Sequence, residues 1–240
     1  MRLLFVILRI IIALAIAIAI VAQLAHSVDF LQGQAGFDQA FFVTNFFSFF
    51  TVDSNAASVV VLLVGAGLAL RRGVGEGSSS SDDSDPLLFT TVRASVVTYM
   101  ITTGIVYNLL LRPLSLPQGQ TLEWSNEILH VVGPIYLLLD WLFAPGRVPL
   151  NYRRLWAIVS FPILWVIYTL IRGPLAIDGT TGKPWYPYPF LNPSTSANGY
   201  LSVSFYVVLI ALVICAIGVG VIWVSRRWQV APQRADAVLS

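Results

Sequence analysis

The stretch from residue 3 to residue 25 reads LLFVILRIIIALAIAIAIVAQLA, and it decides the class of fold. A helix that crosses the hydrocarbon core of a bilayer, about 30 Å thick, needs about 20 apolar residues. This stretch is long enough, and its apolar length exceeds the roughly 7–15 residues of a secretory signal. No clear small-x-small cleavage site ends it. We therefore expect a retained membrane helix.

Further apolar stretches of similar length follow along the chain. They predict an all-α fold, a polytopic membrane protein with a bundle of six transmembrane helices in a single domain. Two of the stretches contain interior prolines, Pro134 and Pro162, which kink a membrane helix but are tolerated there. The expected helices cover residues 3–25, 41–70, 89–111, 125–143, 155–171 and 200–224.

The composition excludes several classes of protein. Hydrophobic residues make up 57% of the chain and charged residues 11%, with a mean hydropathy of +0.77. Soluble proteins have about 45–50% apolar residues and about 25% charged residues. Two histidines and the single cysteine, Cys215, exclude a disulfide framework and a Cys/His metal cluster. A metal site made of carboxylates stays open but unsupported, and no cofactor is expected. The basic residues form no stripe, so no nucleic-acid partner is expected.

The cations report the orientation of the chain. With both termini in the cytoplasm, only Arg112, Arg172 and Lys183 lie outside, so this orientation follows the positive-inside rule. A cell-membrane location is expected. The cations on or near the cytoplasmic side are then Arg2, Arg9, Arg71, Arg72, Arg93, Arg147, Arg153, Arg154, Arg226, Arg227 and Arg234.

Two connections differ in character. The segment 73–86 is polar and lacks an apolar period, which predicts a disordered cytoplasmic linker without chemistry of its own. The external segment 173–199 interleaves prolines with aromatic residues, which favours an interfacial belt or a lid over the bundle. These aromatic residues are Trp185, Tyr186, Tyr188 and Phe190.

Polar residues recur inside the second predicted helix at spacings that put them on one face. They are Thr44, Ser48, Thr51, Asn55 and Ser58. Small polar residues also line ordinary helix contacts in membranes, so packing remains an alternative explanation. Asp53 beside this face is harder to explain that way. A carboxylate at membrane depth costs about 2.5–3.5 kcal/mol and needs a partner, water or a proton.

The fourth predicted helix supplies the complementary groups, because Glu123, Asn126, Glu127 and His130 enter from outside at one-turn spacings. Asn126 or Glu127 can orient the imidazole of His130 through one ring nitrogen, leaving the other available. Thr51 and His130 fall in the same outer half of the bilayer, so they meet if their helices are neighbours. Alternatively, His130 is simply hydrogen-bonded to a neighbouring helix.

A threonine hydroxyl beside a neutral imidazole suits nucleophilic acyl transfer. The histidine takes the hydroxyl proton as the oxygen attacks a carbonyl, and returns it to the leaving alcohol. A developing oxyanion also needs donors where backbone N–H groups are already used by helices. Asn55, Ser54 and Asn126 are the candidates.

The segment 49–55, FFTVDSN, together with Asn126, His130 and the run YPYPF at 186–190, resembles the androgen-induced protein and androgen-dependent regulatory protein family, in particular its bacterial six-span relatives. The animal members are intramembrane threonine hydrolases that split fatty acid esters of hydroxy fatty acids. The resemblance implies Thr51 as nucleophile and His130 as general base. The sequence departs from the animal pattern just after the threonine, where the continuation is more polar. A more polar pocket would favour a different ester, and Asp53 would stabilise an imidazolium at His130 if the two side chains lie close together.

The leading functional prediction is an intramembrane hydrolase of lipid esters, of the type that the resemblance implies, fatty acid esters of hydroxy fatty acids. Its expected partners are the bilayer and a lipid or lipid-ester substrate. The main alternative is a non-catalytic binding or transport protein in which Asp53, His130 and Asp140 form a proton or ligand path. A third is a purely structural protein. Candidate substrate contacts are Arg112, Arg172, Tyr186 and Tyr188. The two arginines end predicted helices, where they also suit snorkelling anchors.

Overall fold

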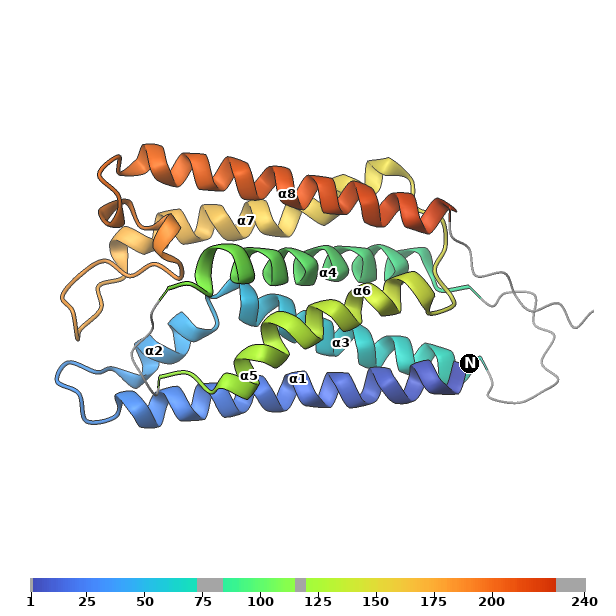
Figure 1. Ribbon diagram of the computed structural model, residues 1–240, viewed down its shortest axis with the longest axis horizontal. Helices are drawn as coiled ribbons and strands as arrows, with labels where there is room; N and C mark the ends of the chain where they lie inside the picture. The colour runs from blue at the N-terminus through green and yellow to red at the C-terminus, as the bar shows by residue number, and fades with distance from the viewer. Residues whose placement is uncertain (1, 73–83, 115–119, 228–240) are drawn as a thin grey trace, which may run out of the picture.

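The computed structural model describes residues 2–72, 84–114 and 120–227, and they form a helical bundle (Figure 1). Its helices are α1 (Arg2–Leu31), α2 (Gln39–Phe46), α3 (Phe50–Arg71), α4 (Leu87–Val106), α5 (Glu123–Glu127), α6 (Gly133–Phe143), α7 (Leu155–Arg172) and α8 (Tyr200–Arg227). Two π-helical turns, η1 (Tyr107–Leu111) and η2 (Ile128–Val132), extend α4 and join α5 to α6. Short 3-10 turns are η3 (Tyr152–Arg154), η4 (Gly173–Leu175), η5 (Pro189–Leu191) and η6 (Pro193–Thr195). The predicted all-helical class is confirmed.

Within the described residues, five helices are long and apolar enough to cross a membrane. They cover Arg2–Leu31, Phe50–Arg71, Leu87–Leu111, Tyr152–Leu175 and Tyr200–Arg227. The predicted fourth helix is instead assembled from α5, η2 and α6. Figure 1 shows this composite segment running obliquely along the bundle, beside α1 and α4.

The helix α4 is the centre of the bundle, because it packs against α3, α6, α7 and α8. Val97 and Met100 on this helix are fully buried. The outer faces of α1, α7 and α8 instead expose large apolar side chains, such as Val21 (66% exposed), Leu164 (66%) and Leu201 (74%). An apolar outer surface of this extent suits lipid contact.

The predicted continuous helix 41–70 is wrong, because the chain breaks between α2 and α3 at residues 47–49. The Ser48 hydroxyl donates to the Thr44 carbonyl at 2.8 Å, which competes with the helical backbone pattern. Side chains of α7 hold the break: the indole of Trp165 donates to the Ser48 carbonyl at 3.1 Å. Thr44 and Ser48 therefore do not continue the helical face that carries Thr51.

The second π-helical turn, η2, lies directly before Pro134, and this proline explains the irregular backbone. Proline has no N–H to donate to the carbonyl one turn earlier, so a neighbour must satisfy that carbonyl inside a membrane bundle. The side-chain amide of Asn108 donates to the His130 carbonyl at 3.4 Å and to the Gly104 carbonyl at 2.8 Å. The hydrogen bond from Asn108 to the His130 carbonyl connects the first π-helical turn, η1, to the second, η2.

The two predicted connections are described to different extents. Residues 73–83 of the predicted linker 73–86 lie outside the described residues. Of the described residues 84–86, Asp85 is buried. The segment 173–199 packs on the start of α3, where the ring of Phe49 lies edge-on to Trp185 and to Tyr188, each at 5.6 Å. Figure 1 shows this segment at the end of the bundle where α7 ends and α8 begins.

Candidate functional site

A cavity of about 300 Å³ opens between α3, α4, α7 and α8, beneath the segment that carries Tyr188. Its walls are mostly apolar and aromatic, including Phe50, Val106, Trp165 and Ile210. The residues that line it also include five that carry a hydroxyl group: Thr51, Thr102, Thr103, Tyr107 and Tyr188. Small-molecule sites are concave, largely apolar and carry a few placed polar groups, which is the character of this cavity.

Thr51 lies in the first turn of α3, and its side chain is buried. The backbone N–H of a first-turn residue has no partner within its helix. The Tyr188 hydroxyl accepts from the Thr51 N–H at 3.1 Å and lies 3.2 Å from Thr51 Oγ1. Burial raises the pKa of Tyr188 to about 12, so its phenol stays neutral at physiological pH. Thr51 and Tyr188 thus form a neutral hydroxyl pair at the cavity wall.

The polar residues that follow Thr51 hold helices together. Ser54 Oγ lies 3.1 Å from the hydroxyl of Thr103 on α4. The side-chain amide of Asn55 donates to the Thr51 carbonyl at 2.9 Å and to the Leu129 carbonyl at 3.1 Å. Because both contacts use its amide nitrogen, Asn55 joins α3 to η2 in this geometry and does not present that amide to the cavity.

His130 lies in η2 with a defined tautomer. Its Nδ1 is 2.9 Å from the Asn126 backbone carbonyl, which can only accept, so Nδ1 carries the proton and the neutral ring offers Nε2 as an acceptor. The imidazole stacks on Tyr107, with ring centroids 3.9 Å apart. Tyr107 lines the cavity, whereas His130 does not. The Tyr107 ring, which stacks on His130 and lines the cavity, therefore links the histidine to the cavity wall.

Thr51 and His130, both described, make no hydrogen bond with each other. The hydroxyl of Thr51 is paired with Tyr188, and Nδ1 of His130 is paired with Asn126. Direct proton transfer between the two predicted catalytic groups is not set up in this geometry. It requires a bridging water or a rearrangement near Tyr107.

The other residues predicted around His130 gather on Tyr107 as well. The Asn126 side chain donates to the Tyr107 hydroxyl, so the backbone of Asn126 and not its amide orients the imidazole. Glu127 pairs with Arg112, whose guanidinium lies 5.6 Å from the Tyr107 ring centroid. The half-buried Asp53 makes no hydrogen bond or ion pair with His130, and both residues are described.

Three of the four predicted substrate contacts do not line the cavity, and one of them, Arg112, is paired with Glu127. Arg172 donates to Asn45 Oδ1 at 2.6 Å and lies over the Trp185 ring at 5.4 Å. Tyr186 packs directly against the backbone of Gly173. Neither of these two residues lines the cavity, whereas Tyr188, which belongs to the same segment 173–199 as Tyr186, does.

A buried ion-pair network near the start of α1 was missed as a unit by the sequence analysis. Asp140 on α6 accepts from Arg9 Nε at 2.8 Å and from Arg93 Nη2 at 2.7 Å. Asp85 accepts from Arg72 Nη1 at 2.9 Å and from Arg93 Nη1 at 3.4 Å. Helices α1, α4 and α6 meet in these contacts, together with Arg72 just after α3 and Asp85 just before α4.

The signal for this network was present in the sequence. Arg9 interrupts an apolar run, and a cation at membrane depth needs a partner. The path predicted from Asp53 through His130 to Asp140 finds no support in the contacts, because Asp140 lies about 15 Å along the helix from His130 and is bonded to arginines. Among the described residues, no three His, Cys, Asp or Glu side chains gather as metal ligands.

Comparison of the chain with protein-family models, curated proteins and solved structures finds no match. The resemblance in residues 49–55, 126, 130 and 186–190 therefore stays a prediction.

Proposed function

We propose that this protein is a membrane protein that binds a lipid, with an acyl chain in the cavity and the ester or carboxyl group at Thr51 and Tyr188. The observation that carries the proposal is an apolar cavity of about 300 Å³ with a hydroxyl pair on its wall. The two hydroxyls offer hydrogen bonds to a carbonyl oxygen, and the aromatic walls suit methylene groups.

Entry from the bilayer is supported by residues that belong to both surfaces. Trp156 and Ile163 line the cavity and are also 77% and 46% exposed on the outside of α7. Because the same residues line the cavity and lie on the outer surface of the bundle, a lipid chain would have a lateral route between the helices. A water-soluble ligand would have to cross an apolar surface to use the same route.

The placement of the chain in the membrane belongs to the proposal. We take the composite segment α5, η2 and α6 as a sixth crossing, with both termini in the cytoplasm of a cell whose plasma membrane holds the protein. In Figure 1 the start of α1 and the end of α8 lie at the same end of the bundle, which supports an even number of crossings. Arg226 and Arg227 lie in the last turn of α8, at that end.

Neighbouring valines of α8 provide the test of lipid binding. Val207 lines the cavity, whereas Val208 is 58% exposed on the outer face of the same helix. We expect Val207→Trp to fill the cavity and to reduce crosslinking by a photoreactive fatty acid about tenfold, an effect within the usual cost of overpacking. Val208→Trp should leave the crosslinking unchanged. Equal crosslinking in the two variants would exclude this cavity as the lipid site.

Hydrolysis of a lipid ester at the same site is the second candidate function. It is favoured by a threonine hydroxyl on the cavity wall and by a histidine tautomer that leaves Nε2 as an acceptor. Thr51 Oγ1 would attack the ester carbonyl, and its proton would pass through a bridging water to Nε2 of His130. The alcohol would leave with that proton, and water would then release the acid from the acyl-enzyme.

An active-site fluorophosphonate probe tests the hydrolase. Labelling of the wild type that is lost in Thr51→Ala and in His130→Ala, and retained in Thr51→Ser, is the expected result, because serine keeps the hydroxyl. Labelling that survives both alanine substitutions would exclude the Thr–His hydrolase. The proposal of lipid binding would then still be tested by the crosslinking of Val207→Trp compared with that of Val208→Trp.

A further inference from the structure

The cavity between α3, α4, α7 and α8 has a polar end and an apolar end. Its polar residues lie toward the end of the bundle where α7 ends and α8 begins, because Thr51 is in the first turn of α3 and Tyr107 follows the end of α4 (Figure 1). Val159 near the start of α7 and Ile214 in the middle of α8 line the opposite end. A ligand with one polar group would therefore bind with that group beside Thr51 and with its apolar part directed toward Ile214.

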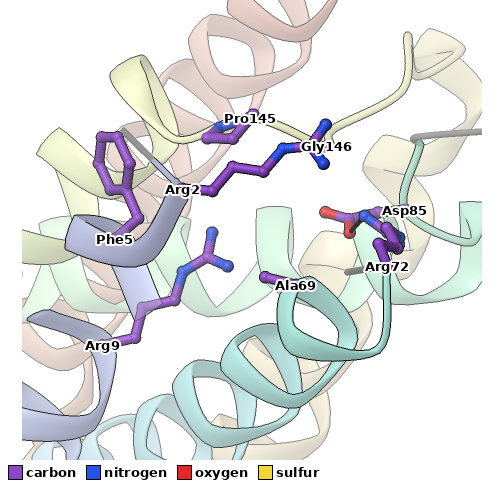
Figure 2. Close-up of a pocket in the computed structure, with 8 residues that line it drawn as sticks. All are labelled: Arg2, Phe5, Arg9, Ala69, Arg72, Asp85, Pro145 and Gly146. Atoms are coloured by element: carbon purple, nitrogen blue, oxygen red, sulfur yellow. Dashed lines mark ion pairs between the residues drawn. The ribbon is translucent and has the colours of Figure 1, made fainter. Parts of the chain in front are cut away.

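The polar end offers hydroxyl groups and no charge. Among the described residues, none of those that line the cavity is charged. Figure 2 shows the contrast at the small pocket where α1 begins, where the guanidinium groups of Arg9 and Arg72 lie near the carboxylate of Asp85. An ionised carboxylate in the cavity would lose its hydration without gaining a cation. The hydroxyl pair of Thr51 and Tyr188 instead suits an uncharged carbonyl group, because one of its two protons bridges the pair and the other remains for the ligand.

The apolar end of the cavity is closed by a close approach of α7 and α8 at Gly218. A Cβ built on Gly218 would lie 2.9 Å from Leu155 Cδ1 and 3.5 Å from Ile158 Cγ2, so a larger residue would push the two helices apart. Ile158 is fully buried, and its carbonyl accepts from the Tyr99 hydroxyl at 2.7 Å. Ile214 lies one helical turn before Gly218 and is buried as well. These contacts fix the floor of the cavity.

The distance from the polar end to this floor limits the ligand. The cavity residues of α8 run from Val207 to Cys215, eight residues or about 12 Å along the helix. An extended acyl chain advances about 1.3 Å per carbon, because its C–C bonds are about 1.5 Å long, so about nine carbons cover that length. The volume of about 300 Å³ gives a similar number. A methylene group occupies about as much space as a water molecule, about 30 Å³, so about ten carbons fill the cavity.

We propose that the cavity takes an uncharged ester whose acyl chain has about ten carbons, with the carbonyl at Thr51 and Tyr188 and the chain end at Ile214. This inference rests on the proposed lipid binding and adds the charge of the polar group, the direction of the chain and its length. A protonated carboxyl group meets the same requirement for charge, whereas an ionised one does not.

Competition for a photoreactive methyl ester tests the length and the charge in the detergent-solubilised full chain. Methyl esters with acyl chains of six, ten and sixteen carbons are compared at equal mole fraction in the micelles, so that their different solubilities in water do not contribute. The ten-carbon ester should compete about tenfold better than either of the others, because a shorter chain leaves a void and a longer one overpacks the cavity. Decanoate at alkaline pH should compete about tenfold less than methyl decanoate.

Two buried isoleucines of α8 provide matched variants. Ile214 lines the cavity, whereas Ile222 lies beyond Gly218 and does not. Ile214→Ala removes side-chain carbons from the floor, so the best competitor should become longer by about three carbons. Ile222→Ala is the same chemical change and should leave the best length at ten carbons.

Cys215 provides a measurement that needs no substitution. It is the single cysteine of the chain, and it lines the cavity next to Ile214. Methyl decanoate should slow alkylation of this thiol by N-ethylmaleimide about tenfold, because the reaction depends on access to the sulfur. Methyl hexanoate at the same occupancy should leave the rate unchanged, since its chain ends before it reaches Cys215.

The outcomes separate this inference from the proposed function. Equal competition by the three esters, or equal protection of Cys215 by the six-carbon and ten-carbon esters, would overturn the ten-carbon limit. Lipid binding would remain supported in that case if Val207→Trp still reduces crosslinking. If Val207→Trp has no effect, the lipid site itself fails, and the chain-length inference fails with it. Equal competition by decanoate and its methyl ester would overturn the requirement for an uncharged group.

Discussion

Asp140 illustrates how one side chain can hold several helices in a membrane bundle. It is 1% exposed, and its carboxylate accepts from Arg9 and Arg93, which lie on α1 and α4. The Asp140 backbone carbonyl also accepts from Arg93 Nη2 at 2.7 Å. Each partner offsets the desolvation of the others, so the three residues are stable only together.

We therefore expect Asp140→Asn to destabilise the fold by about 3–5 kcal/mol, because it leaves two buried cations with reduced compensation. Glu127→Gln is the matched control: Glu127 is an acid of the same composite segment, and its ion pair with Arg112 is exposed. That substitution should leave stability almost unchanged. Unfolding by denaturant in detergent measures both. Similar losses in the two variants would contradict a special role for the buried pair.

At the scale of single residues, the sequence indicated which residues are candidates for the site, but it did not predict their hydrogen-bond partners. It singled out Thr51, His130 and Tyr188, and the structure places Thr51 and Tyr188 together on one cavity wall. It did not predict that Asn126 orients His130 through its backbone. Partner choice depends on how neighbouring helices are rotated, and a single sequence carries little information about that rotation.

At the scale of elements, the positions of most long helices were predictable, because a bilayer crossing needs about 20 consecutive apolar residues. The predicted helix 155–171 agrees closely with α7 (Leu155–Arg172). The break at residues 47–49 was not predictable, because it contains no proline or glycine and depends on side chains of α7, such as Trp165. The π-helical turn before Pro134 likewise depends on the Asn108 amide of another helix.

The segment 173–199 packs on the end of α7 through a close contact between Tyr186 and Gly173. A Cβ at this position would overlap the ring of Tyr186, so Gly173→Ala forces the segment away. We expect a loss of about 1–3 kcal/mol in stability, together with weaker crosslinking of a fatty acid in the cavity, because Tyr188 belongs to the same segment. Thermal unfolding and the crosslinking assay measure the two effects.

Gly67→Ala is the control for this substitution. It is the same chemical change inside α3, where no atom lies within 4 Å of the added carbon. Alanine favours a helix over glycine by about 1 kcal/mol, so the control should be neutral or stabilising. A comparable loss in both variants would show that the contact with Tyr186 is unimportant.

At the scale of the whole molecule, the central helix α4 connects two polar centres in an otherwise apolar bundle. Near one end, its Thr103 and the following Tyr107 border the cavity, and toward the other end its Arg93 joins the ion pairs. The sequence predicted the membrane class, the helical fold and most of the polar positions. It did not predict that the polar positions separate into a neutral site and a charged one, because that division depends on packing between helices distant in sequence.

The contact between Arg9 and Asp140 joins residues 131 positions apart, and this separation bears on how the protein is made. Helices enter the bilayer in the order of their synthesis, so α1 arrives while the carboxylate that neutralises its arginine has not yet been translated. Until then the arginine must stay near the bilayer surface or beside a chaperone, because its charge is costly at depth. The contact that joins α1 to α6 can therefore form only after α6 has been translated, and α7 and α8 follow it along the chain.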